Sequence, residues 1–210
     1  MRTNLYPVSH EGWKYIAYAA LAFILFSIFD IDFFQFLSLG SLLFFIVVFR
    51  NPEREAPLFE EFSVVSPVDG LVVSIEELQD KEYSYKVKIE SNYLDVSVLR
   101  VPLKSSIRSI ELKKGARLSS SNPLFEKINE YCALTFEDKN SNKIKVVHRL
   151  KQSFDSIHID AFVNQTRLQG GRYGVMLNGV TTLYLPLNFR LNVNVGNQVK
   201  ASETLVGYFS

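Results

Sequence analysis

The sequence predicts a mainly β protein: a membrane-anchoring α-helical hairpin followed by a β-rich domain of sandwich or barrel type. Two observations lead to this fold class. Two predominantly apolar runs lie close together near the N-terminus, and the rest of the chain contains many short segments in which apolar and polar residues alternate. Apolar runs of this kind are typical of helices in lipid, whereas alternation with a period of two is typical of half-buried strands.

The helical hairpin is expected within residues 1–50, with helices at about 13–29 and 33–49 joined by an acidic turn at Asp30-Ile31-Asp32. Each apolar run has 17 residues. At about 1.5 Å per residue, this is slightly short of a hydrocarbon core of about 30 Å. Two short spanning helices are favoured, and a re-entrant hairpin is the alternative. A cleaved signal peptide fits less well, because a second apolar run follows the first instead of a small-residue cleavage site.

Positive charges flank the outer ends of the hairpin. Arg2 and Lys14 lie before or at the start of the first run, Arg50 and Arg54 follow the second, and the connecting turn carries only acids. The positive-inside rule then places both termini in the cytoplasm. We therefore expect a multi-pass protein of the cell inner membrane whose β-rich domain, residues 51–210, is cytoplasmic.

The charge balance of residues 51–210 excludes some classes of function. This part carries 20 Lys and Arg against 19 Asp and Glu, which is typical of an ordinary globular domain and argues against a nucleic-acid binder. The single cysteine, Cys132, excludes an intramolecular disulfide and is expected to be a small core residue rather than a nucleophile.

The β-rich domain is predicted to consist of short strands and tight turns. Only residues 123–129 predict a short helix, and the glycine-rich stretch 170–174 predicts a turn without the lysine of a phosphate-binding loop. The expected strands are 63–65, 71–75, 85–90, 94–101, 107–112, 132–137, 143–150, 156–163, 180–185 and 189–195.

Two histidines lie in predicted strands, His148 and His158. They are ten residues apart and have no cysteine or carboxylate at the spacing of metal ligands. No metal site is therefore expected, and both residues are predicted to be partly buried.

A set of motifs runs in a fixed order through almost the whole chain. In chain order these are Phe49–Arg54 directly after the hairpin, Val65–Gly70, Leu94–Pro102, Asn129–Tyr131, Gly170–Val180, Tyr184–Pro186 and Val193–Leu205. Together they resemble the phosphatidylserine decarboxylase family, specifically its short, archaeal-type branch. The last of these segments, Val193–Leu205, is predicted to form a hairpin, and this hairpin is also similar to those of lipoyl- and biotinyl-carrier barrels. An adaptor module is therefore a further hypothesis.

The resemblance implies a pyruvoyl-dependent enzyme of phospholipid metabolism. Members of this family cut themselves between Gly and Ser, convert the serine to a pyruvoyl group, and decarboxylate phosphatidylserine to phosphatidylethanolamine. Self-cleavage there resembles a Ser-His-Asp arrangement. Carried onto this sequence, the aspartate position is retained as Asp69, the histidine position holds Ser97, and the serine position, after the cleavage-site relic Gly179, holds Val180.

These substitutions change the expected function. Valine has no heteroatom to attack a carbonyl and serine is no base near neutral pH, so we expect no pyruvoyl cofactor at this position. An acyl shift through Thr181 or Thr182, with His158 as the base, remains an alternative that would yield an oxobutanoyl group. The favoured function is a non-catalytic relative that binds a lipid headgroup or acts as a partner protein. The alternative is an active decarboxylase.

We expect the protein to bind membrane phospholipids and not nucleic acid. A homo- or hetero-oligomer is compatible with the sequence. Arg100 and Arg172 are the candidates for headgroup binding, because a guanidinium pairs bidentately with phosphate or carboxylate.

Overall fold

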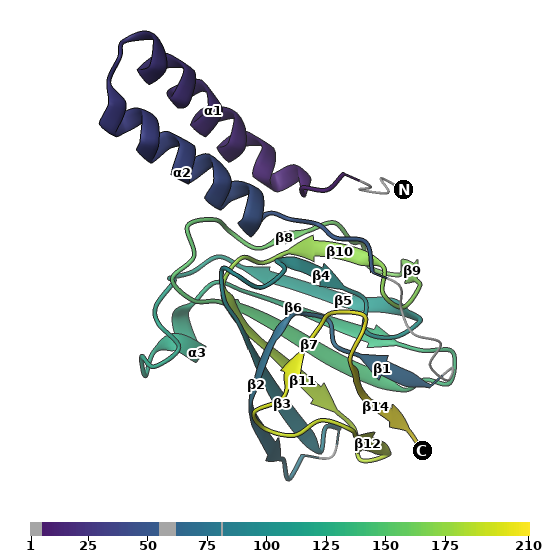
Figure 1. Ribbon diagram of the computed structural model, residues 1–210. Coiled ribbons are helices and arrows are strands. Elements are labelled where there is room, and N and C mark those ends of the chain that lie inside the picture. The colour runs from purple at the N-terminus through teal and green to yellow at the C-terminus, as the bar shows by residue number, and fades with distance from the viewer. Residues whose placement is uncertain (1–5, 55–61, 81) are drawn as a thin grey trace. The chain divides into compact units, whose positions relative to one another are not determined.

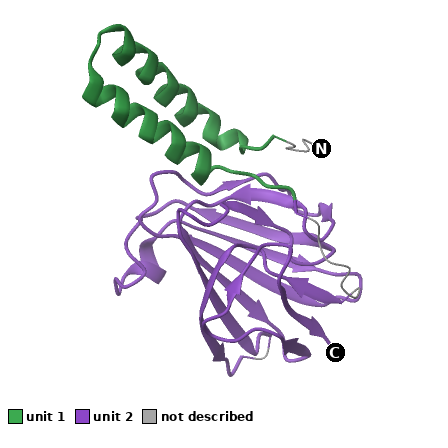
Figure 2. Ribbon diagram, viewed as in Figure 1, with its two compact units in different colours: residues 1–53 green, residues 54–210 purple. Residues whose placement is uncertain are grey.

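The computed structural model describes residues 6–54, 62–80 and 82–210, and its chain divides into two compact units, residues 1–53 and 54–210 (Figure 2). The first unit is a pair of helices and the second consists mainly of antiparallel strands. The mainly β fold class with an N-terminal helical hairpin is therefore confirmed. The flanking charge Arg2 and the part of the linker at 55–57 lie outside the described residues.

The first unit is a helical hairpin (Figure 1). A short 3-10 turn, η1 (His10–Gly12), leads into α1 (Trp13–Ile28), and α2 (Asp32–Val48) follows after a tight turn. In that turn Asp30 adopts a φ of 51°, a left-handed conformation that aspartate tolerates better than most residues. Asp32 occupies the first turn of α2, where a carboxylate interacts favourably with the helix dipole. Both helices end within one residue of the predicted positions.

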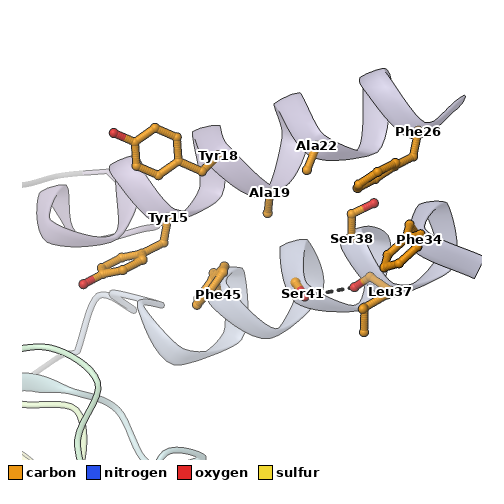
Figure 3. Close-up of a pocket in the computed structure, with 10 residues that line it drawn as sticks. All are labelled: Tyr15, Tyr18, Ala19, Ala22, Phe26, Phe34, Leu37, Ser38, Ser41 and Phe45. Carbon is orange, nitrogen blue, oxygen red and sulfur yellow. Dashed lines mark hydrogen bonds between the residues drawn. The ribbon is translucent and has the colours of Figure 1, made fainter. Parts of the chain in front are cut away.

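The two helices pack through small residues between aromatic pairs (Figure 3). The rings of Tyr15 and Phe45 are 5.3 Å apart and those of Phe26 and Phe34 are 5.2 Å apart. Small residues between these pairs let helix backbones approach closely in lipid. They leave a shallow apolar groove of about 360 Å³, whose lining includes Ala19, Ala22, Ser38 and Ser41.

The outward face of the hairpin is strongly apolar. Phe33 is 72% exposed, for example, and only 11% of the helical window within His10–Ile28 is buried. That segment is long and apolar enough to cross a membrane, while α2, with 17 residues, is apolar but shorter. Exposed apolar surface of this extent is typical of helices whose surroundings are lipid.

Within its described residues, 62–80 and 82–210 together with Arg54, the second unit contains three antiparallel sheets. The largest has eight strands in the order β13-β2-β3-β11-β7-β6-β5-β9, and two three-stranded sheets have the orders β1-β14-β12 and β4-β10-β8. The elements are β1 (Ser63–Val65), β2 (Gly70–Glu77), β3 (Tyr85–Ser91), β4 (Val98–Arg100), β5 (Ser105–Lys113), α3 (Phe125–Ile128), β6 (Tyr131–Glu137), β7 (Lys143–Leu150), β8 (His158–Ile159), β9 (Thr166–Arg167), β10 (Arg172–Val175), β11 (Gly179–Leu185), β12 (Phe189–Leu191), β13 (Gln198–Val199) and β14 (Leu205–Phe209).

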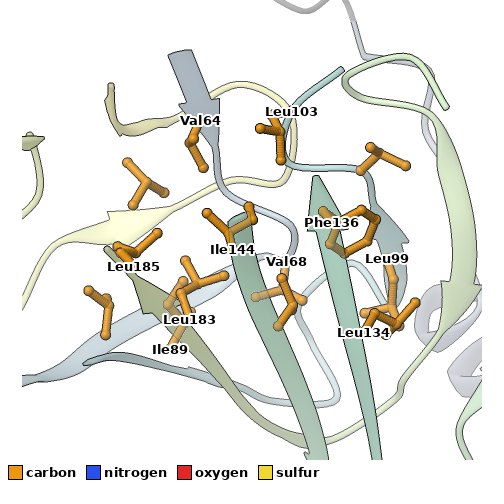
Figure 4. Close-up of a cluster of buried hydrophobic side chains, with 14 of the residues drawn as sticks. Val64, Val68, Ile89, Leu99, Leu103, Leu134, Phe136, Ile144, Leu183 and Leu185 are labelled. Carbon is orange, nitrogen blue, oxygen red and sulfur yellow. The ribbon is translucent and has the colours of Figure 1, made fainter. Parts of the chain in front are cut away.

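One hydrophobic core joins the three sheets of this unit (Figure 4). The large sheet contributes side chains such as Phe136 and Leu183, while Val64 of β1 and Leu99 of β4 come from the two small sheets. The core therefore fills the space between one face of the large sheet and the small sheets, as in a sandwich. Cys132 is fully buried in it, and burial raises the pKa of its thiol to about 12. This agrees with a core residue and not with a reactive thiolate.

The strand prediction fails most clearly around the glycine-rich stretch 170–174. Arg172–Val175, predicted as part of a turn, forms strand β10 between β4 and β8. Gly174 is needed there for close packing, because a Cβ at this position would lie 2.4 Å from the carbonyl oxygen of His158. The predicted strands 94–101 and 156–163 are also shorter than expected, at 98–100 and 158–159.

Candidate functional site

Asp69, the retained aspartate, lies in the loop between β1 and β2 and is buried. Arg54 donates to both of its carboxylate oxygens, from Nη1 to Oδ1 at 2.5 Å and from Nη2 to Oδ2 at 2.6 Å. The backbone N–H of Ala201 also donates to Oδ1, at 2.8 Å. Burial disfavours the charged guanidinium, yet the hydrogen bonds and charge of Asp69 outweigh this effect and raise the pKa of Arg54. The carboxylate is therefore held by a permanent cation.

Gly179 and Val180 begin β11, in the middle of the large sheet. Val180 is paired with Glu90 of β3 on one side and with Arg149 of β7 on the other. A Cβ on Gly179 would lie 2.5 Å from the carbonyl oxygen of Arg149, so this position admits only glycine without rearrangement. The retained glycine thus has a structural reason that is independent of any cleavage chemistry.

The backbone of Asp69 lies near the start of β11, although its side chain is bound elsewhere. Ser91 donates from its hydroxyl to the carbonyl oxygen of Asp69 at 2.5 Å, and Ser91 is the partner of Gly179 in the ladder between β3 and β11. Ser97, at the histidine position, is buried just before β4, and its carbonyl accepts the N–H of Met176 at 2.8 Å.

A cavity of about 530 Å³ opens on the face of the large sheet opposite to the core, and Val180 and Thr182 line it. Further lining residues are Lys88 and Glu90 of β3, Arg149 of β7, and the segment around α3. Strand geometry explains this arrangement, because Thr181, Leu183 and Leu185 point to the core and their neighbours therefore point outward. The position that the sequence predicts to correspond to the family's cleavage serine thus borders a charged cavity, which we call the Val180 cavity.

Arg149 is a cavity residue that sequence reasoning missed. It lies in a predicted strand, but its position over the cavity depends on the pairing of β7 with β11, which no local pattern specifies. Its guanidinium contacts the rings of Tyr131 and Phe125, with its carbon 5.2 and 5.9 Å from the ring centroids.

The two arginines proposed for headgroup binding lie elsewhere in the unit. Arg100 of β4 and Arg172 of β10 are directly opposite one another in the small sheet, and neither lines the Val180 cavity. Arg100 is only 4% exposed, and its Nη1 donates to the carbonyl oxygen of Gly170 at 3.1 Å. The guanidinium of Arg100 is therefore bound to backbone inside the fold.

His148, and not His158, is the histidine beside a threonine of β11. Its Nδ1 lies 2.8 Å from Oγ1 of Thr181, and its Nε2 lies 2.6 Å from the hydroxyl of Tyr173. Burial lowers the pKa of His148 to about 3, so the ring is neutral at physiological pH. His158 instead contacts Asp155, with 3.1 Å between Nε2 and Oδ2. In the described ranges neither histidine belongs to a cluster of three or more metal-ligating side chains.

Comparison with known proteins relates this site to a family. A family model described as phosphatidylserine decarboxylase matches residues 42–207. The chain belongs to the phosphatidylserine decarboxylase family. It is 30% identical to the phosphatidylserine decarboxylase proenzyme of Geobacter metallireducens over 99% of both chains, and 28% identical to that of Desulfotalea psychrophila over 96% of both. A third proenzyme, from Geotalea daltonii, is 29% identical over 99% of both chains.

Membership of the phosphatidylserine decarboxylase family confirms the resemblance drawn from the ordered motifs. Because the relatives align over nearly their full lengths, the likeness extends across the helical hairpin as well as the β-rich unit.

Proposed function

We propose that this chain is a non-catalytic phosphatidylserine decarboxylase-family protein that binds phospholipid headgroups at the cytoplasmic face of the inner membrane. The observation that carries the proposal is that Val180, at the position of the cleavage serine, lines a charged cavity. The cavity is present in this chain, whereas the hydroxyl needed for self-processing is missing at position 180.

The residues at the three family positions do not fit formation of a pyruvoyl group. Self-processing there needs a hydroxyl to attack the carbonyl of Gly179, and valine carries none. A base is also needed, yet Ser97 has no useful basicity near neutral pH. The carboxylate of Asp69, which would orient such a base, already accepts hydrogen bonds from Arg54 and from the N–H of Ala201.

The composition of the cavity supports headgroup binding. Charged side chains of both signs lie beside the apolar side chains of Val73 and Val180 in a space of about 530 Å³. Phospholipid headgroups likewise combine charged groups with a glycerol frame. Sites with a few polar groups on an apolar wall are typical of small-molecule recognition.

The proposal includes two passes of the hairpin through the membrane. The second helix, α2, has 17 residues, which span roughly 26 Å and need some local thinning of the bilayer. Lys14 and Arg50 lie at the outer ends of the two helices, and the turn between them carries Asp30 and Asp32. This asymmetry supports a cytoplasmic location for the β-rich unit.

Mass spectrometry of the purified full-length protein tests the loss of self-processing. We expect one chain of 24.0 kDa and no release of carbon dioxide from phosphatidylserine. Two fragments cut near Gly179, the second with a blocked N-terminus, would refute the proposal. Titration of the chain in detergent micelles with short-chain phosphatidylserine then tests lipid binding, and equal binding of an uncharged short-chain lipid would argue against it.

One observation favours the alternative of an active enzyme. The contact between Thr181 and His148 places a hydroxyl beside an imidazole. In this alternative Oγ1 attacks the carbonyl carbon of Val180, and the ester then eliminates to free the Val180 carboxylate. Water displaces ammonia from the remaining enamine, leaving a 2-oxobutanoyl group on Thr181. The same mass spectrum decides the matter, because this route cuts one residue later, after Val180.

A further inference from the structure

We propose that Arg149 is the phosphate-binding residue of the Val180 cavity, and that this cavity takes glycerophosphate-type headgroups whatever amine or alcohol they carry. The inference rests on the proposed function and deepens it, since it names the chemical group that the cavity recognises. In this proposal the headgroup is bound by Arg149 and not by Arg100 and Arg172, which lie in the small sheet β4-β10-β8.

The contacts of Arg149 leave its hydrogen-bonding edge available. Two aromatic rings, those of Tyr131 and Phe125, contact the guanidinium. Its two terminal nitrogens, Nη1 and Nη2, form no hydrogen bond within the part of the chain that the structure describes, and its Nε is buried. A guanidinium that lies against rings keeps its N–H groups in one plane, ready for two parallel bonds to phosphate. The aromatic contacts therefore orient the guanidinium of Arg149 without occupying its hydrogen-bond donors.

Three of the other charged side chains that line the cavity, Lys88, Glu90 and Glu126, are already paired, whereas Lys127 of α3 is an exposed cation. Lys88 donates to Glu126 at 2.8 Å, and Glu90 accepts from Lys151. The pKa of Glu126 is lowered, foremost by its hydrogen bond with Lys88, so both partners stay charged and neutralise one another. Among the described carboxylates, none forms an ion pair with Arg149. The unbalanced charge in the cavity is therefore positive, which selects an anion.

The remaining lining favours phosphate over a carboxylate alone. Ser120, Ser121 and Thr182 add hydroxyl groups to the same cavity as the guanidinium. A tetrahedral phosphate offers several acceptor oxygens in different directions, whereas a carboxylate offers two in one plane. The apolar side chains of Val73 and Val180 line the same space and would contact the carbon chain of a glycerol group.

Calorimetric titration of the full-length chain in detergent micelles tests the assignment. The probes are glycerol 3-phosphate and glycerophosphoserine, with free serine as the probe that lacks phosphate. We expect the two phosphate esters to bind with similar affinity and serine not to bind. Arg149→Gln should weaken both phosphate esters by at least about tenfold, because a charge-assisted hydrogen-bonding group is lost. Arg149→Lys should retain part of the affinity, since it keeps the charge without the fork.

The matched control is Arg190→Gln, which removes the same charge from an exposed position on β12. It should bind as the unchanged protein does. Unchanged binding by Arg149→Gln, or serine binding as well as glycerophosphoserine, would overturn the assignment. A short-chain phosphatidylserine dispersed in the same micelles separates the sources of phosphate: binding of this lipid that Arg149→Gln loses identifies a lipid, whereas binding of the soluble esters alone identifies a free phosphate ester. The intact-mass measurement is independent, so failure here leaves the absence of self-processing untouched.

Discussion

The guanidinium of Arg54 and the carboxylate of Asp69 form two parallel hydrogen bonds, of 2.5 and 2.6 Å, in a buried position. The aspartate that would orient a catalytic base is thereby part of an ion pair. The same guanidinium donates to the carbonyl oxygen of Ala201 at 2.8 Å, so the pair also connects the start of this unit to the segment between β13 and β14. Asp69 and Arg54 therefore hold two distant parts of this unit together.

Removal of Arg54 should destabilise the β-rich unit. Arg54→Ala leaves the carboxylate of Asp69 buried without its cation, which typically costs about 3–5 kcal/mol. Chemical denaturation followed by circular dichroism measures the change. The double variant Arg54→Ala with Asp69→Asn should recover part of the loss, because no uncompensated charge remains. A loss within about 0.5 kcal/mol of zero, the range of ordinary surface substitutions, would contradict a structural role for the pair.

Acid should destabilise the unit through His148. Burial lowers its pKa in the folded state to about 3, against an ordinary value of about 6.5 for histidine. Because folding depresses this pKa, the stability linked to the neutral ring is fully present above pH 6.5 and is lost as the pH falls toward 3. The slope approaches about 1.4 kcal/mol per pH unit in that window.

Thermal melting across this pH range measures the effect of His148. His148→Gln should flatten the dependence between pH 6.5 and 3, while His158→Gln, at a partly exposed position, should leave it unchanged. A wild-type melting temperature that stays constant over the window would rule out the buried neutral ring as the cause.

Restoring the serine alone should not restore self-cleavage. Val180→Ser supplies the hydroxyl, but Ser97 is still no base and Asp69 is still bound to Arg54. We expect an uncut chain in the mass spectrum after prolonged incubation. The appearance of fragments ending at Gly179 would mean that another group, such as a histidine outside the family positions, serves as the base.

Gly179 should prove intolerant of substitution for reasons of packing. An added Cβ would meet the carbonyl oxygen of Arg149 at 2.5 Å and the sulfur of Met176 at 2.6 Å. Gly179→Ala should therefore cost about 1–3 kcal/mol, as overpacking typically does. Gly40→Ala, with nothing within 4 Å of the added atom, is the control and should cost nothing measurable in a denaturation experiment. Equal stability of both variants would remove the packing explanation for the retained glycine.

The sequence predicted the fold class and the helix ends well because both depend on local patterns. The apolar runs and the turn at Asp30 specify the hairpin directly, and alternation marks the long strands such as β7 and β11. The short strand β10 was missed because Gly174 suggests a turn, whereas it serves here to bring two backbones together.

The site was harder to predict because it depends on pairing between distant strands. The ordered motifs identified positions 69, 97 and 180, but not that Arg54 binds Asp69. Arg149 reaches Val180 only through the register of β7 with β11, and the partner of Thr181 proved to be His148 rather than His158. Sequence spacing carries no information on such contacts.

The two faces of strand β11 have different surroundings. Val180 borders the cavity, whereas the adjacent Thr181 bonds to His148 in the core. A substitution at position 180 therefore changes the wall of the cavity and leaves the contacts of the interior intact. Recognition at this face of the sheet can change independently of the packing that stabilises the fold.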